Sequence, residues 1–300
     1  MLVVGVDGRR RGWIAVAIEQ GAFAGASVFA DLRTLVSRLT TAEVIGVNLP
    51  VGLLESGLRL CDRLAQHEAG PLAQRVLLVP PRPVLQEPSA EQAEAACRRL
   101  CGEALCRTSY ALRDRILELD AVVHDPALAA GRSGDEDGPT MRLDRRRAFS
   151  APGRHHARII DREGGLAARH GARVIDRPSD RPAVPSPLPP SSAPAAAGTA
   201  PGGWIIEAHA ELSFGAMTGA PLLHAGDSIE GRVARHRAIE RAGIRFPSTL
   251  VETGGACVDD LLDAAAVAWT AGRYARGEAH SLPAPEHWQR DAWQSVAIWC

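Results

Sequence analysis

Residues 177–203 constrain the fold of this chain more than any other segment. Their sequence, RPSDRPAVPSPLPPSSAPAAAGTAPGG, consists largely of Pro, Ser, Ala and Gly and has no hydrophobic periodicity. Such a segment cannot bury enough apolar surface to offset the entropy of ordering, so it predicts a disordered or polyproline-like linker. The folded core must therefore be built from the sequence on either side.

The residues before this linker also differ in composition from a folded domain. Residues 142–175 are dense in Arg and His and contain only short apolar runs. They favour a solvated insertion, although weak folding or contact with an anionic partner also fits this composition. We therefore expect residues 1–130 and 204–300 to be two parts of one domain, separated by a largely disordered insertion at residues 131–203.

The composition of the whole chain limits its class. Of the 300 residues, 46% are hydrophobic, which is enough for a sizeable core in one large domain or two smaller ones. The formal net charge is −1, so overall basicity does not indicate a nucleic-acid binder. Lys is absent and 34 positions are Arg, which we attribute to genome composition, although Arg also suits bidentate contact with phosphate.

The sequence predicts a cytoplasmic protein that does not bind membranes. No apolar run is long enough to span a bilayer, and the N-terminus lacks the charged-then-apolar pattern of a signal peptide. Six cysteines in a chain of this length do not make a disulfide framework. The spacing of Cys97, Cys101 and Cys106 raises zinc binding but favours reduced thiols at helical spacing.

Apolar runs and helical spacing predict an α/β domain. Short runs rich in Val and Ile are typical of strands, whereas Leu112, Ile116 and Leu119 recur at the spacing of a helix. Asp31 is placed to cap another helix. The predicted strands cover residues 2–6, 13–18, 26–29, 43–49 and 204–206, and the predicted helices cover residues 31–39, 89–100 and 109–123.

Acidic residues lie at both ends of the sequence. Asp7 ends the first predicted strand in LVVGVDG, and Asp259, Asp260 and Asp263 begin a predicted helix in VDDLLDAAAVAWTA. Asp260 and Asp263 share a helix face, where a cation would relieve their mutual repulsion. Carboxylates so far apart in sequence suggest one metal site. The alternatives are a simple turn at Asp7 and a helix-capping cluster that includes Asp259.

Seven passages occur in an order that resembles a known family. They are VGVDGRRRGW, VNLPVGL, GLRLCDRLA, VPPRPVL, GEALCRTSYALRDRILELDA, IEAHAELSFGAMTG and VDDLLDAAAVAWTAGRYARGEA. Together they resemble successive motifs of domain-of-unknown-function family 429, the predicted ribonuclease H-like nucleases. The resemblance implies a ribonuclease H-like mixed sheet flanked by helices, with a three-strand meander, a helix, a fourth strand and a late helix bearing the last acid. It also implies phosphodiester hydrolysis of nucleic acid.

The resemblance further implies a site for Mg²⁺ or Mn²⁺. Asp7 matches the first-strand acid that bridges two divalent ions, and Asp260 and Asp263 match the acids of the final helix. Glu207 and Glu211 match the two Glu of the family's E-x-H-P-E motif, although this chain lacks its Pro. The metal ligands that the resemblance implies are Asp7, Glu207, Asp260 and Asp263.

Two positions depart from the family pattern. Asn48, in VNLPVGL, stands where family members resemble IDIPIGL, so an amide replaces an expected Asp. Its carbonyl oxygen can still bind a cation, but the loss of one charge should weaken a two-ion site. The family's Lys-Lys after the E-x-H-P-E segment has no counterpart, which leaves Arg232 and Arg235 as the nearest basic side chains. Both departures put catalysis in question.

Several arginines are candidates for phosphate binding. The Arg-rich turn after Asp7 could steer phosphate toward the metal ions, or it could be a solvated hairpin turn. A further candidate lies in PPRPVL. The predicted substrate-binding residues are Arg9, Arg10, Arg11 and Arg82.

His209 lies between the two Glu of the E-x-H-P-E-like segment. It could shuttle protons or orient water, or it could be a buried histidine bonded to the backbone. The predicted catalytic residues are therefore Asp7, Asn48, Glu207, His209, Glu211, Asp260 and Asp263.

Three functions fit these observations. The first is a metal-dependent nuclease, based on the acidic residues. The second is a catalytically inactive ribonuclease H-like binding protein, based on Asn48 and the missing lysines. The third is an actin-like or sugar-kinase-like phosphotransferase, because those folds share the core and also open with Asp-Gly. The chain shows no second Gly-rich phosphate loop, which weighs against the third function.

Overall fold

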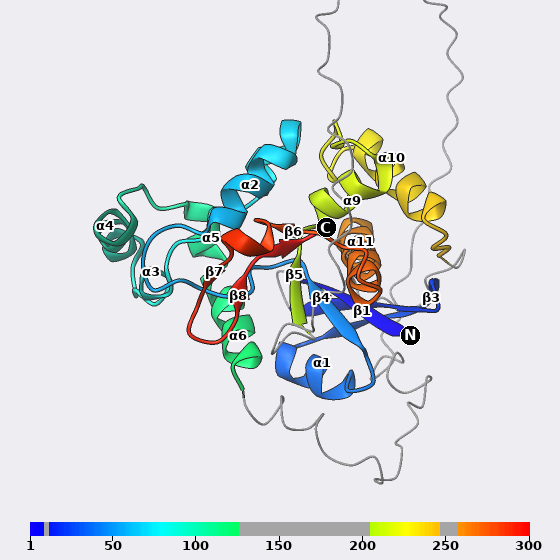
Figure 1. The fold of residues 1–300 in the computed structure, drawn as a ribbon, viewed down its shortest axis with the longest axis horizontal. Coiled ribbons are helices and arrows are strands. Elements are labelled where there is room, and N and C mark those ends of the chain that lie inside the picture. The colour runs from blue at the N-terminus through cyan, green and yellow to red at the C-terminus, as the bar shows by residue number, and fades with distance from the viewer. Residues whose placement is uncertain (9–11, 126–204, 247–256) are drawn as a thin grey trace, which may run out of the picture. The chain divides into compact units, whose positions relative to one another are not determined.

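A central mixed sheet organises the part of the chain that the structure describes (Figure 1). The computed structural model describes residues 1–8, 12–125, 205–246 and 257–300. These residues belong to one of two compact units, and the second unit, Pro152–Ala197, falls outside the described residues. The predicted insertion at residues 131–203 lies outside them as well, so its lack of regular structure stays a prediction.

The strands of the described residues are β1 (Leu2–Gly8), β2 (Trp13–Glu19), β3 (Ala22–Phe29), β4 (Val44–Val47), β5 (Ile205–Ala208), β6 (Ser281–Leu282), β7 (Gln289–Arg290), β8 (Ser295–Val296) and β9 (Ile298–Trp299). Seven of them form the central sheet in the order β3-β2-β1-β4-β5-β9-β6. The first three strands make an antiparallel meander. Strands β4, β5 and β9 continue the sheet in parallel from β1, and the predicted α/β class is confirmed.

The predicted strands are present, with shifted ends. β3 starts at Ala22, four residues earlier than predicted, because its register with β2 continues to the tip of the hairpin. β4 ends at Val47, two residues earlier than predicted, where the chain turns toward Pro50. Side chains alternate along β1, so Val4 and Val6 contact one hydrophobic cluster and Val3 contacts the other.

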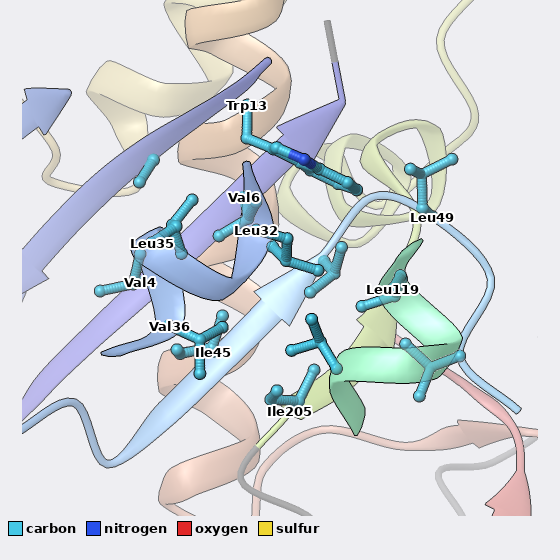
Figure 2. Close-up of a cluster of buried hydrophobic side chains, with 14 of the residues drawn as sticks. Val4, Val6, Trp13, Leu32, Leu35, Val36, Ile45, Leu49, Leu119 and Ile205 are labelled. Atoms are coloured by element: carbon cyan, nitrogen blue, oxygen red, sulfur yellow. The ribbon is translucent and has the colours of Figure 1, made fainter. Parts of the chain in front are cut away.

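Helices α1 (Leu32–Arg38) and α6 (Arg113–Val123) cover one face of the sheet. Asp31 caps α1 as predicted, because its Oδ1 accepts the backbone N–H of Thr34 at 2.7 Å. Burying a large apolar side chain contributes about 1.5–3 kcal/mol, so this cluster is a major source of stability. Figure 2 shows part of the cluster, including Val4, Val6, Trp13, Leu32, Leu35, Val36, Ile45, Leu119 and Ile205.

Helix α11 (Val258–Ala275) covers the other face, and α9 (Ala210–Thr218) and α10 (Ile229–Arg241) pack beside it. α11 approaches the sheet closely because Gly5 and Gly46 are opposite each other in β1 and β4. A Cβ atom at Gly5 would overlap the carbonyl oxygen of Ala264, and one at Gly46 would lie 2.9 Å from the carbonyl oxygen of Val267. The two glycines therefore set the position of α11.

The remaining helices of the described residues are α2 (Leu60–Glu68), η1 (Gly70–Arg75), α3 (Arg82–Leu85), α4 (Ala90–Cys101), α5 (Arg107–Ala111) and η2 (Pro285–His287). α4 confirms the helix predicted at residues 89–100, with Ser89 as its cap. The single helix predicted at residues 109–123 is wrong. Leu112, with φ −95° and ψ 5°, separates α5 from α6, since local backbone geometry at that residue overrides the apolar spacing.

The predicted helical spacing of Cys97 and Cys101 is confirmed, because both lie in α4. All six cysteines are free, and Cys97 and Cys101 lie one turn apart in α4 with their sulfur atoms 3.3 Å from each other. Across the described ranges, no helix combines the length and the apolar character that a membrane crossing requires.

Candidate functional site

A cavity of about 380 Å³ opens at the carboxyl ends of β1, β4 and β5. Asp7 lies near the end of β1, Asn48 directly follows β4, and Glu207 lies in β5. The three strands are parallel neighbours, so their ends meet at one edge of the sheet. Ligands of open α/β sheets bind at this edge, which makes the cavity the leading candidate for a functional site.

Helix α11 brings Asp263 to the same cavity. Asp263 precedes Ala264, the residue whose carbonyl oxygen lies against Gly5, so the close packing of α11 on β1 fixes where this carboxylate lies. Six of the predicted catalytic residues line the cavity. They are Asp7, Asn48, Glu207, His209, Glu211 and Asp263.

Asn48 is held by two hydrogen bonds. Its Nδ2 donates to Oδ1 of Asp7 at 2.9 Å, and its Oδ1 accepts the backbone N–H of Ala210 at 3.0 Å. The second contact fixes the orientation of the amide, because a backbone N–H can only donate. Cation binding by the Asn48 carbonyl oxygen stays a prediction, and in this orientation the oxygen does not face Asp7. The NH₂ group faces Asp7, since the oxygen is directed to the start of α9.

The carboxylates of Asp7 and Asp263 repel each other. Burial raises the pKa of Asp7 well above its usual value, and the charge of Asp263 raises it further. The hydrogen bond from Asn48 opposes this rise. Burial, followed by the charge of Glu211, raises the pKa of Asp263 to about 7. Asp260 does not line the cavity, although its charge also raises the pKa of Asp7.

Glu207 is paired with a buried arginine. Its Oε2 accepts the backbone N–H of Val51 at 2.8 Å and contacts the Nη2 atom of Arg59. The side chains of Arg59 and Glu207 are 1% and 6% exposed, so this is a desolvated ion pair. Oδ1 of Asp62 lies 3.5 Å from Nε of the same arginine. The predicted role of Glu207 as a metal ligand would have to compete with this pair.

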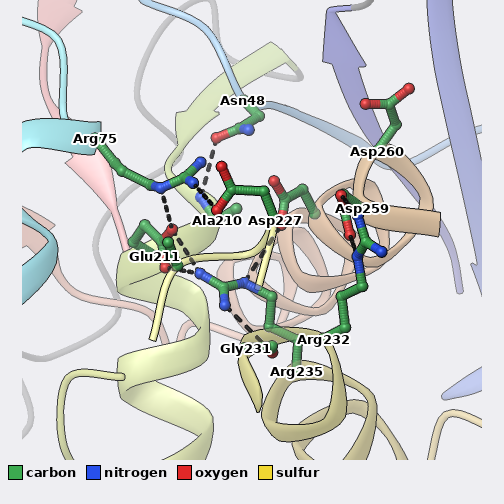
Figure 3. Close-up of polar contacts among 12 residues, drawn as sticks. Asn48, Arg75, Ala210, Glu211, Asp227, Gly231, Arg232, Arg235, Asp259 and Asp260 are labelled. Atoms are coloured by element: carbon green, nitrogen blue, oxygen red, sulfur yellow. Dashed lines mark hydrogen bonds and ion pairs between the residues drawn. The ribbon is translucent and has the colours of Figure 1, made fainter. Parts of the chain in front are cut away.

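Glu211 has a similar partner on the adjacent helix (Figure 3). Both of its carboxylate oxygens accept hydrogen bonds from Nη2 of Arg235, at 2.6 and 2.5 Å. Arg235 also donates from Nη1 to the carbonyl oxygen of His224 at 2.9 Å. Asp263 has a weaker contact with the same guanidinium, since its Oδ1 lies 3.9 Å from Nε.

His209 is the N-cap of α9. Its Nδ1 accepts the backbone N–H of Glu211 at 3.2 Å, so the ring proton of the neutral imidazole lies on Nε2. A hydrogen bond with the backbone of Arg75 engages the ring as well. Burial lowers the pKa of His209 to about 4, which keeps the ring neutral at pH 7. These contacts favour the reading of His209 as a buried residue that positions the backbone.

The arginines of the site differ from those that the sequence analysis selected. Arg75 and Arg115 line the cavity, and neither is among the predicted site residues. Arg115 lies within the motif GEALCRTSYALRDRILELDA, whereas Arg75 lies outside all seven passages. Arg82 does not line it, because its guanidinium is paired with Asp120 and Glu55. Substrate binding by Arg82 therefore stays a prediction. The predicted phosphate contacts of the Arg-rich turn fall on residues 9–11, which lie outside the described residues.

The family assignment rests on a sequence match to the model described as Protein of unknown function (DUF429). The match covers residues 5–133 and 193–287, which is most of the chain. The chain belongs to this family. All seven predicted catalytic residues fall within the matched segments. No curated protein and no solved structure matched the chain.

Two of the acids in the DUF429 site, Asp7 and Asp263, could hold a divalent cation through their carboxylate oxygen atoms. Asp263 contacts a guanidinium only at 3.9 Å, whereas Glu207 and Glu211 are engaged more closely by Arg59 and Arg235. Among the residues with described positions, no three His, Cys, Asp or Glu side chains are grouped to hold a metal ion. Mg²⁺ is commonly held by one or two carboxylates, with water and substrate phosphate completing its ligands.

Proposed function

We propose that this chain is a divalent-cation-dependent hydrolase that cleaves phosphodiester bonds in nucleic acid. The proposal rests on one observation: Asp7 and Asp263 line the same cavity at the strand ends. Both carboxyl groups have raised pKa values, and each raises the free energy of the other when ionised. A divalent cation between them would remove this repulsion. A cytoplasmic location belongs to the same proposal.

The sheet topology supports a ribonuclease H-like fold as part of this proposal. The strands β1, β2 and β3 form the three-strand meander, α1 follows, and β4 then pairs in parallel with β1. β5 extends the parallel part, and α11 carries the late acids. This is the arrangement that the family resemblance implies.

Mg²⁺ or Mn²⁺ would be held by Asp7 and Asp263, and it would supply Lewis-acid activation of water and neutralise charge on the phosphate. Asn48 fixes the rotamer of Asp7 through the 2.9 Å hydrogen bond, so this carboxylate is oriented in advance. Neutral His209 holds the start of α9 and the backbone of Arg75. His209 is therefore a positioning residue in this proposal.

A catalytically inactive binding protein is the second candidate. It is favoured by the contacts of Asn48, whose carbonyl oxygen accepts the Ala210 N–H and is directed away from Asp7. It is also favoured by the buried pairs of Glu207 and Glu211, which reduce the number of available ligands. In this case, the cavity would retain nucleic-acid or protein contact without turnover.

Calorimetry and cleavage assays distinguish these candidates. We expect the purified full-length protein to bind Mn²⁺ or Mg²⁺ and to cleave fluorescently labelled single-stranded, duplex or branched DNA or RNA. Asp263→Asn should weaken metal binding at least tenfold and abolish cleavage. Asp259→Asn is a matched control, because Asp259 lies on the same helix but is paired with Arg232 at 2.7 and 2.9 Å.

The two outcomes are separable. Metal binding without cleavage of any substrate would favour the inactive protein. Failure of the wild-type protein to bind either ion, in the presence of nucleic acid as well as alone, would overturn the hydrolase proposal.

A further inference from the structure

Arg75 has a different environment from the buried arginines of the site. It is the last residue of η1, and its side chain lines the cavity. The neighbouring backbone is anchored, because Nε2 of Gln66 donates to the carbonyl oxygen of Val76 at 3.0 Å and His209 bonds to the Arg75 backbone. The side chain, in contrast, is 36% exposed. A fixed backbone thus presents a partly solvated cation to the cavity.

The main partner of Arg75 is an acid that solvent can reach. Nη2 of Arg75 donates to Oδ1 of Asp227 at 2.8 Å, and the Asp227 side chain is 74% exposed (Figure 3). Glu211 lies farther away, 4.0 Å from Nε, and already accepts two hydrogen bonds from Arg235. Exposed ion pairs are weak because water screens them. The Arg75–Asp227 pair can therefore be exchanged for another anion at low cost.

Arg75 lines the same cavity as Asp7 and Asp263, the candidate metal-binding carboxylates. An anion bound to Arg75 would therefore lie in the cavity that contains both carboxylates. A guanidinium presents paired N–H groups that match two oxygen atoms of a phosphate.

We propose that Arg75 is a phosphate-binding residue of this cavity and that Asp227 occupies its guanidinium until a phosphate group displaces it. Asp227 precedes Ser228, the N-cap of α10, and does not itself line the cavity. It acts as an internal competitor that sets the affinity for anions. The identity of the ligand as a phosphodiester rests on the proposed function, whereas the competition between Asp227 and phosphate does not.

Binding measured without divalent cations tests this proposal. The probes are inorganic phosphate, followed by the melting temperature at constant ionic strength, and a labelled oligothymidine, followed by fluorescence anisotropy, both in EDTA. Asp227→Asn should bind each probe three- to tenfold more tightly than wild type. Arg75→Gln should bind at least tenfold more weakly. Arg75→Lys should be intermediate, because it keeps the charge but loses the paired donors.

Glu103→Gln is the matched control for the change in net charge. Glu103 and Arg63 form another exposed ion pair, with side chains 44% and 48% exposed, and neither residue lines the cavity. Equal effects of Asp227→Asn and Glu103→Gln would overturn the proposal, as would unchanged binding by Arg75→Gln. If Arg75→Gln does not fold, Arg75→Lys and Asp227→Asn decide the question. Tighter binding of acetate than phosphate would also overturn it, because it would indicate a carboxylate ligand.

The result is separable from the hydrolase proposal. If the wild-type protein cleaves no nucleic acid but the Asp227→Asn and Arg75→Gln effects appear, the phosphate site stands and the hydrolase proposal fails. If cleavage is observed and the two variants bind both probes as wild type does, the hydrolase proposal stands and Arg75 is not the phosphate-binding residue.

Discussion

The acids that line the cavity form two groups, a first wall of Glu207 and Glu211 and a second wall of Asp7 and Asp263, which differ in how their charges are balanced. On one wall, Glu207 and Glu211 are each paired with a buried arginine, Arg59 or Arg235. On the other wall, Asp7 receives a hydrogen bond from a neutral amide, and Asp263 lies 3.9 Å from the nearest guanidinium nitrogen. The comparison teaches that carboxylates in one cavity need not share a role. The charges of Glu207 and Glu211 are offset by buried arginines at close range, whereas those of Asp7 and Asp263 are offset only by an amide and by a longer ion pair.

The largest expected effect comes from breaking a pair on the first wall. Arg235→Leu leaves Glu211 buried without its partner, so the free energy of unfolding should fall by about 3–5 kcal/mol. Urea denaturation measures this change. The double variant Arg235→Leu/Glu211→Leu should recover most of the loss, because it removes both charges. A double variant as unstable as the single one would show that the pair is not what stabilises this wall.

A smaller loss is expected when α11 is displaced from the second wall. Gly5→Ala should reduce the free energy of unfolding by about 2–3 kcal/mol, because the new methyl group overlaps the Ala264 carbonyl. It should also weaken metal binding, since Asp263 would move away from Asp7. Gly215→Ala is the control, because the nearest atom lies 3.9 Å from its Cβ position. Equal metal affinity in Gly5→Ala and wild type would show that Gly5 does not control the position of Asp263 in the site.

Asn48→Asp adds a third charge to the second wall. The change replaces the NH₂ donor that faces Asp7 with a carboxylate, so repulsion should lower the free energy of unfolding at pH 7 by about 1–2 kcal/mol. Mn²⁺ should restore this loss in thermal denaturation, because an ion that binds the folded state stabilises it. If metal gives the variant no more stabilisation than wild type, the inactive binding protein becomes the better account.

The smallest effect is a change in pH dependence. The folded pKa of Asp263 is about 7 against an ordinary value of 3.8, so the folded state holds this proton more tightly. Its contribution to stability is full below pH 3.8 and is lost as pH rises through 7. The full shift would correspond to about 4 kcal/mol, but the Asp263 side chain is 29% exposed and solvent screens much of the repulsion. Asp263→Asn should therefore raise the free energy of unfolding at pH 8 by about 1 kcal/mol and have little effect at pH 4.

Urea denaturation at both pH values provides the measurement. Asp259→Asn should stabilise the protein less than Asp263→Asn at pH 8, because Asp259 repels Asp263 but is paired with Arg232. Equal stabilisation by the two substitutions would show that the repulsion is spread over the helix and is not specific to the cavity.

Much of the fold could be predicted from local sequence. The apolar runs around Val4 and Val16 identify strands because periodicity and β-branching are local signals, and Asp31 identifies a helix start for the same reason. The family motifs identified residues that meet at the cavity. The break at Leu112 was missed, since the spacing of the apolar residues continues through it.

The balance of charge in the site could not be predicted in the same way. Arg59 reaches Glu207 across 148 residues of sequence, and only the folded chain shows that this pair is buried. The direction of the Asn48 amide depends on the backbone N–H of Ala210, which is also distant in sequence. Ion pairs and hydrogen bonds of this kind depend on tertiary structure. The sequence motifs show only which residue types are present.

The opposed glycines of β1 and β4 also have a consequence for the order of folding. Gly5 and Gly46 belong to early strands, but the backbone that fills the space above them belongs to α11, which lies beyond most of the chain. Closing a contact over such a separation costs more entropy than forming a local hairpin, and it is made later in folding. The meander can form early, whereas the cavity is assembled only when α11 docks. If docking of α11 is delayed, the face of β1 and β4 that it covers stays open to contact with other molecules before the cavity has formed.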